Sequence, residues 1–91
     1  MKLRAHIFIE GLVQGVFFRS EIQNQAKKHQ VTGWVRNLSD GRVEAVFEGE
    51  EKDVKELVEF CKHGPIGAKV ENVIAVWTSF TDEFGNFELK W

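Results

Sequence analysis

The chain is organised around residues 11–19, which read Gly11-Leu12-Val13-Gln14-Gly15-Val16-Phe17-Phe18-Arg19. A strand-like run, Leu3 to Ile9, precedes this segment, and a helix-like run, Ser20 to Gln30, follows it. A glycine-bounded loop between a strand and a helix suits an anion, because its N–H groups lack partners and the helix N-terminus carries partial positive charge. The guanidinium of Arg19 can donate two parallel hydrogen bonds to a phosphate. The segment therefore predicts a phosphate-binding loop.

The glycine spacing excludes two well-known phosphate motifs. The segment lacks the G-x-G-x-x-G pattern of dinucleotide-binding folds, and no Lys-Ser or Lys-Thr pair follows Gly15, as an ATP-type P-loop requires. From these residues alone a simpler interpretation stays open. In that interpretation the segment is a strand-to-helix turn with two flexible glycines and a surface arginine.

The flanking residues predict the first strand and the first helix. Apolar residues alternate along the chain from Leu3 to Ile9, and this period of two indicates a half-buried strand with His6 on its outer face. Phe18, Ile22 and Ala26 are four residues apart, which indicates an amphipathic helix.

Turn signals divide the rest of the chain. The pair Asp40-Gly41 separates extended runs at residues 34–38 and 43–47 and predicts a β-hairpin. An acidic first turn, apolar residues at helical spacing and the stop signal Gly64-Pro65 predict a second helix that includes Cys61. A long apolar strand at residues 70–77 and a short edge strand at residues 87–91 follow.

The predicted elements follow the order strand, helix, strand, strand, helix, strand. Two right-handed crossovers in this order give an α+β, ferredoxin-like βαββαβ sandwich. We expect a mainly antiparallel sheet of four to five strands with both helices on one face. The 91 residues make a single domain, 1–91.

Composition argues against several classes of partner. A formal net charge of −2 gives no bulk attraction to nucleic acid or membranes, and no apolar run approaches the roughly 20 residues of a spanning helix. The N-terminus lacks a secretory pattern, and the single cysteine, Cys61, fits a reducing cytoplasm. We expect a cytoplasmic protein without nucleic-acid or membrane partners. No His/Cys/Asp cluster is apparent, so we expect no metal or other cofactor.

Two ordered blocks of this sequence resemble the acylphosphatase family. The first is Gly11-x-Val13-Gln14-Gly15-Val16-x-Phe18-Arg19, and the second is Gly33-Trp34-Val35-Arg36-Asn37-x-x-x-Gly41-x-Val43, continued to Gly49. The likeness covers essentially the whole chain. It implies the ferredoxin-like architecture, a monomer, and hydrolysis of the carboxyl–phosphate bond of acyl phosphates to carboxylate and inorganic phosphate.

The resemblance also implies that Arg19 binds the phosphate and that Asn37 positions the attacking water. The amides of Gln14, Gly15, Val16, Phe17 and Phe18 would form the phosphate loop. An asparagine amide offers a donor and an acceptor and does not titrate near neutral pH, which suits that role. Without the resemblance, Asn37 could equally be a turn residue that binds its own backbone. Neither Arg19 nor Asn37 is a nucleophile, so we expect direct hydrolysis without a phosphoenzyme.

Two alternatives stay open from the sequence. One is a non-catalytic ferredoxin-like module that binds an anion, RNA or a protein on the open sheet face, where Phe8, Trp34 and Val46 are expected. The other is an acylphosphatase-like domain that serves a larger machine, as in hydrogenase maturation proteins. The sequence does not decide which acyl phosphate is the substrate, in which pathway the protein acts, what its oligomeric state is, or what role residues 80–91 have.

Overall fold

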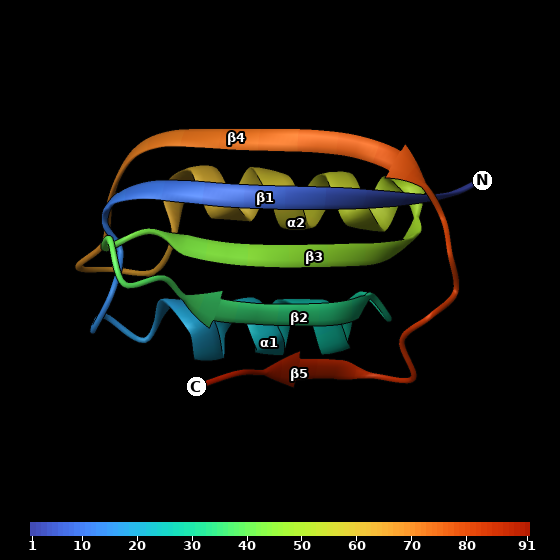
Figure 1. Cartoon of the computed structure of the whole chain (residues 1–91), viewed down its shortest axis with the longest axis horizontal. Coiled ribbons are helices and arrows are strands. Elements are labelled where there is room, and N and C mark those ends of the chain that lie inside the picture. Colours follow the sequence, from blue (N-terminus) through green and yellow to red (C-terminus); the bar gives the residue numbers. More distant parts are fainter.

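The computed structural model describes residues 1–91, and it contains one sheet and two helices (Figure 1). The elements in chain order are β1 (Lys2–Leu12), α1 (Phe18–Lys28), β2 (Thr32–Asn37), β3 (Val43–Glu50), α2 (Glu51–His63), β4 (Lys69–Ser79) and β5 (Phe87–Leu89). Both helices cover the same face of the sheet (Figure 1). This architecture confirms the ferredoxin-like α+β fold with both helices on one face.

The strand order in the sheet is β4-β1-β3-β2-β5. Three of the pairings are antiparallel, and β5 pairs with β2 in parallel. The parallel pairing brings the C-terminus back toward the N-terminal end of α1 and the end of β2 (Figure 1). The last residues of the chain therefore lie beside the loop between β1 and α1, which contains the glycine-rich motif.

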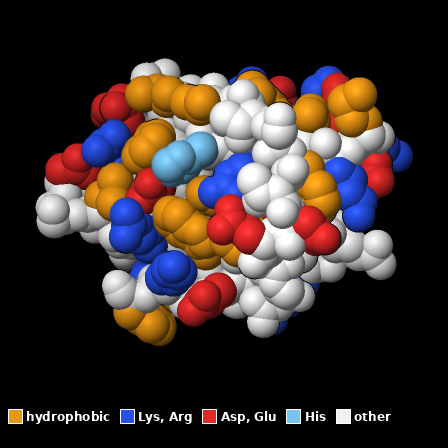
Figure 2. Space-filling view, turned by 45° about the vertical axis from the view of Figure 1, so that its right-hand side comes forward, with side chains coloured by type: hydrophobic (Ala, Val, Ile, Leu, Met, Phe, Trp, Pro, Cys, Tyr) orange, Lys and Arg blue, Asp and Glu red, His pale blue; other side chains and the backbone are white.

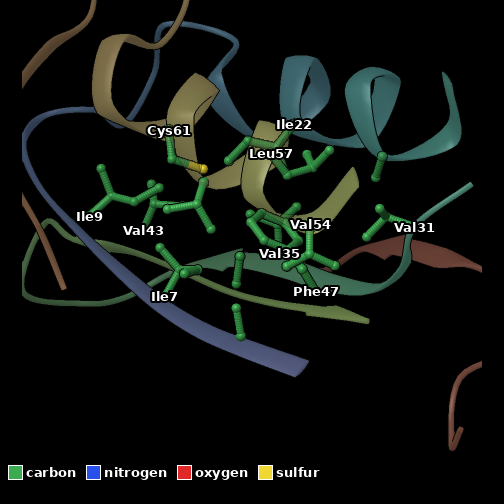
Figure 3. Close-up of a cluster of buried hydrophobic side chains, with 14 of the residues drawn as sticks. Ile7, Ile9, Ile22, Val31, Val35, Val43, Phe47, Val54, Leu57 and Cys61 are labelled. Carbon is green, nitrogen blue, oxygen red and sulfur yellow. The ribbon is translucent and has the colours of Figure 1, made fainter. Parts of the chain in front are cut away.

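The hydrophobic core lies between the sheet and the helices. Ile22 of α1 and Leu57 of α2 point toward Ile7, Val35 and Phe47 of the sheet (Figure 3). The exposed fraction of each of these five side chains is 0%. This packing fixes the two helices over the central strands, and with them the loop that leads into α1.

Helix α1 begins at Phe18, two residues before the helical run that the sequence indicates. The preceding residue, Phe17, adopts a left-handed backbone conformation with φ 61° and ψ 20°. A bulky residue rarely takes this conformation, so the sequence does not predict the left-handed turn at Phe17, although the spacing of Phe18, Ile22 and Ala26 agrees with the observed start of the helix. The end of α2 agrees with the sequence, since the helix ends at His63 and Gly64 follows with φ 69°.

Strand β3 is more deeply buried than its alternating pattern suggests. Seven of its eight residues are buried, including Glu44 and Glu48. Burial raises the pKa of both carboxyl groups, but hydrogen bonds outweigh that effect, so both pKa values are lowered. The bonds to Glu44 come from His6, at 2.6 Å, and Arg36, at 2.7 Å.

The segment between β4 and β5 passes one end of the sheet and binds Glu48 there (Figure 1). The Glu48 carboxylate accepts hydrogen bonds from the backbone N–H of Thr81, at 2.9 Å, and of Asp82, at 3.1 Å. The Thr81 hydroxyl, at 2.7 Å, and Arg4, at 3.3 Å, also donate to it. One buried carboxylate therefore anchors the crossover that leads to β5.

The open face of the sheet carries half-buried aromatic side chains, and the β4 edge carries exposed apolar ones. Phe8 and Trp34 lie beside His6, with ring centroids 4.7 and 6.3 Å from the His6 ring. On β4, which forms one edge of the sheet, Ile74, Val76 and Trp77 are 41–49% exposed. In Figure 2, acidic and basic side chains are interspersed with hydrophobic ones, so no large patch of one charge covers that view. Neither helix is long and apolar enough to cross a membrane.

Candidate active site

The backbone of the loop before α1 presents N–H groups without partners. Gly15 (φ 74°) and Phe17 (φ 61°) both have left-handed backbone angles, which turn successive amides toward one side. None of the N–H groups from Gly15 to Ser20 donates a hydrogen bond within the chain. Those of Phe18 to Ser20 are the unpaired donors of the first turn of α1, and together with the loop donors before them they are suited to an anion.

The side chain of Gln14 ties this loop to the β2–β3 turn. Its Nε2 atom donates to the carbonyl oxygens of Leu38, at 2.7 Å, and Arg42, at 2.9 Å. Both acceptors are backbone atoms of the connection that follows Asn37. Gln14 therefore braces the two segments that the sequence motifs single out, and its side chain does not line the cavity described below.

Asn37 is the last residue of β2, and its side chain lines a cavity with the loop. Its Oδ1 atom is buried and has no hydrogen-bond partner within the chain. A buried acceptor without a partner costs about 1–3 kcal/mol, which makes such an atom unusual in a folded protein. The position points to a ligand or an ordered water as the missing donor.

Arg19 lies in the first turn of α1, and residues at the end of the chain hold its guanidinium. Its Nη1 atom donates to the carbonyl oxygen of Lys90, at 2.8 Å. Its Cζ atom lies 4.5 Å from the centre of the Trp91 ring, a distance typical of a cation–π contact. The other guanidinium donors have no partner within the chain and remain available to a ligand.

The loop, Asn37 and the chain terminus enclose a cavity of about 310 Å³. Its lining residues are Val13, Gly15, Phe17, Phe18, Arg19, Ser20, Asn37, Leu89 and Trp91. The structure thus brings together five of the seven residues that the sequence predicts for the site. Of the other two, Gln14 braces the loop, and Val16 packs partly against the core.

Leu89 and Trp91 line the cavity but do not belong to the residues predicted from the sequence. The sequence predicts a short edge strand at residues 87–91, and β5 (Phe87–Leu89) confirms it. However, the pattern cannot tell which strand the tail pairs with. Only the parallel pairing of Val35 with Leu89 brings the end of the chain to Arg19.

The nucleophilic side chains of the chain are engaged or remote from the cavity. The Ser20 hydroxyl donates to the carbonyl oxygen of Phe17, at 3.0 Å, and no base contacts it. Cys61 is fully buried in the core, and burial raises the pKa of its thiol. No group of three or more His, Cys, Asp or Glu side chains is placed to hold a metal ion.

Comparisons with known proteins agree on one family. The sequence model of the acylphosphatase family matches residues 5–89. The chain is 52% identical over 89 residues to an acylphosphatase of Chloroflexus aurantiacus, covering 98% of this chain and 97% of that protein. It is 49% identical over 88 residues to an acylphosphatase of Pelotomaculum thermopropionicum, covering 97% and 96%. The crystal structure of acylphosphatase from Bacillus subtilis superposes with a TM-score of 0.93 at 35% identity, covering 98% of this chain and 99% of that one.

Proposed function

The chain belongs to the acylphosphatase family and hydrolyses acyl phosphates, and we propose that it does so by direct attack of a water molecule on phosphorus. In this step a bond forms between the water oxygen and phosphorus. The bond between phosphorus and the carboxyl oxygen breaks, and its electron pair leaves with the carboxylate. The water proton passes to the phosphate product or to solvent.

A carboxylate is a good leaving group, so the reaction needs no strong general acid. The remaining tasks are to hold the phosphoryl oxygens, spread their charge and align the water. We assign the first two tasks to Arg19 and to the amides from Gln14 to Phe18. The free N–H groups of Gly15, Val16 and Phe17 and the free donors of Arg19 support this assignment. Because these groups can neutralise the phosphate, we expect no metal requirement.

We assign the third task to Asn37. The observation that carries this assignment is its buried Oδ1 atom, which has no partner within the chain, in a residue that lines the same cavity as Arg19. A water molecule that donates one hydrogen to Oδ1 would present an oxygen lone pair to a phosphate on the loop. No lining residue is a free nucleophile, since Ser20 donates to Phe17, and we therefore expect no phosphoenzyme.

The remaining expectations concern the state of the protein in the cell. We propose a monomer in the cytoplasm that has no nucleic-acid partner. A net charge of −2 and the mixture of both charges on the surface support the last point, since RNA-binding surfaces are strongly basic.

The test is hydrolysis of benzoyl phosphate in excess chelator by the intact chain and by Asn37→Ala. We expect fast turnover by the intact chain, and a decrease in kcat of roughly 10²–10³-fold in the variant, the effect of losing one transition-state contact. Asn72→Ala is a matched control, because Asn72 is an exposed residue of β4 outside the cavity, and its side chain donates a hydrogen bond to Glu10. Equal rates for Asn37→Ala and Asn72→Ala would contradict the role of Asn37. Loss of turnover in chelator would contradict metal independence.

A further inference from the structure

The cavity beside Arg19 has more room than a phosphoryl group needs. Its volume of about 310 Å³ lies at the lower end of the range for sites that bind small organic ligands. Five of its nine lining residues are hydrophobic. A phosphate held by the loop amides and Arg19 leaves this apolar part of the cavity to the rest of the substrate.

Two aromatic rings at the cavity are exposed to solvent. The exposed fraction is 81% for Phe17 and 95% for Trp91, while Leu89 beside them is half-buried. Phe17 is moreover kept in a strained left-handed conformation, and such strain occurs at sites of function. Together, exposure and strain indicate that these rings are placed for a ligand to cover.

The cavity offers one cation only. Arg19 is the single charged residue in its lining. Two other arginines, Arg36 and Arg42, lie close to Asn37 in the sequence, but both form ion pairs and neither lines the cavity. Arg36 binds Glu44 at 2.7 Å and Arg42 binds Asp40 at 2.8 Å.

Lys90 is also turned away, with its Nζ atom 5.0 Å from the centre of the Trp34 ring. A second anionic group on the substrate would therefore lose hydration at the apolar wall without gaining a cation.

We propose that Phe17, Leu89 and Trp91 form a subsite for the acyl group of the substrate. The subsite favours acyl phosphates whose acyl group is flat and apolar over those that carry a second anionic group. This assignment rests on the proposed function, because it requires the phosphate to lie between the loop and Arg19. Trp91 then has two contacts, with the guanidinium of Arg19 and with the acyl group.

The test measures kcat/KM for benzoyl, acetyl and succinyl phosphate, which carry a flat apolar, a small and an anionic acyl group. For the intact chain we expect benzoyl phosphate to exceed acetyl phosphate by about tenfold, the scale of selectivity of an apolar pocket, and succinyl phosphate to be poorest. In Trp91→Ala the ratio of benzoyl to acetyl phosphate should fall toward one. Phe17→Ala, at a second exposed ring, should lower the same ratio.

Trp77→Ala is the matched control, because Trp77 is a partly exposed tryptophan on β4 outside the cavity. In this variant the ratio of kcat/KM for benzoyl phosphate to that for acetyl phosphate should stay unchanged. The inhibition constant of inorganic phosphate shows which of the two contacts of Trp91 matters. Inorganic phosphate has no acyl group, so its binding depends only on the contact of Trp91 with Arg19. An unchanged constant in Trp91→Ala, with a reduced ratio, supports the acyl subsite.

Two results would overturn the subsite while leaving the proposed function intact. One is equal kcat/KM for the three substrates with the intact chain. The other is a uniform decrease for all three in Trp91→Ala, which would mean that Trp91 acts only by holding Arg19. Absence of turnover with every substrate by the folded intact chain would instead contradict the proposed function itself.

Discussion

At the scale of single residues, the guanidinium of Arg19 is restrained before any substrate binds. The Lys90 carbonyl accepts one of its hydrogen bonds, and the Trp91 ring covers one of its faces. Each contact contributes only about 0.5–1.5 kcal/mol, but together they reduce the number of side-chain conformations of a long, flexible residue. If Arg19 binds the phosphate as proposed, this restraint lowers the entropy lost on binding.

This arrangement predicts different kinetic defects for Arg19→Ala and Asn37→Ala. In the proposed mechanism Arg19 contacts the phosphate in the ground state and in the transition state, so its loss should raise KM and lower kcat/KM by at least ~10²-fold. In the same proposed mechanism Asn37 positions the water, so its loss should lower kcat more than it changes KM. Steady-state kinetics with benzoyl phosphate measure both parameters.

Arg42→Ala is the control for Arg19, because Arg42 is paired with Asp40 and does not line the cavity. It should change kcat/KM by no more than a few-fold. An equal rise of KM in Arg19→Ala and Asn37→Ala would argue against the division of roles.

At the scale of elements, the backbone of β2 has a conformation at Gly33 that leaves no room for a side chain beside β3. Gly33 has φ 136°, and a Cβ atom there would lie 1.8 Å from the Val46 carbonyl oxygen. The backbone of β3 cannot move away without disturbing its pairing with β1 on the other side. The same strand ends at Asn37, so its pairing with β3 helps to position the candidate site.

We therefore expect Gly33→Ala to lower the free energy of unfolding by more than about 3 kcal/mol, because the clash involves backbone atoms. Gly41→Ala is the matched control. Gly41 also has a positive φ, 99°, but a Cβ atom there meets nothing within 4 Å, so only about 1 kcal/mol of backbone strain should result. Urea denaturation of both variants measures the difference. Similar losses in the two variants would show that strain, and not the clash, dominates at Gly33.

Sequence patterns predict the elements better than they predict the burial of β3. Periodicity and turn residues locate both helices and all five strands, because each signal is local. Burial of Glu48 depends on Thr81 and Asp82, which lie more than 30 residues away and donate their backbone N–H groups to it. No local pattern encodes such a contact. The same holds for Trp91, whose place beside Arg19 follows from the parallel pairing of β5.

At the scale of the whole molecule, two buried carboxylates make stability depend on pH. Burial opposes ionisation of Glu48, but the hydrogen bonds from Thr81 and Arg4 prevail and lower its pKa below the usual 4.5. A lowered folded-state pKa means that ionised Glu48 stabilises the fold above about pH 4.5. That contribution is lost as the pH falls through the folded-state pKa, and Glu44 behaves in the same way.

We expect the free energy of unfolding to decrease on acidification from about pH 5 to pH 3, and to decrease less steeply in Glu48→Gln. At pH 7 this variant should be about 2 kcal/mol less stable, because it loses charge-assisted hydrogen bonds. Urea denaturation at a series of pH values measures both effects. Glu59→Gln, on an exposed ion pair with Lys62, should have the pH profile of the intact chain. An unchanged slope in Glu48→Gln would assign the acid sensitivity to other carboxylates.

The outer edge of β4 is a site where the protein could aggregate in concentrated solution. One side of this strand pairs with β1, and the seven residues from Val73 to Ser79 carry no charge and no proline. Such a segment can template the same strand of another molecule, because neither repulsion nor a missing N–H group interrupts backbone pairing. Because this edge is exposed in the folded protein, fibril growth from it would not require unfolding. Its rate would depend on protein concentration and not on the free energy of unfolding. A lysine in place of Val76 would act as a gatekeeper, since two copies of the edge would repel each other.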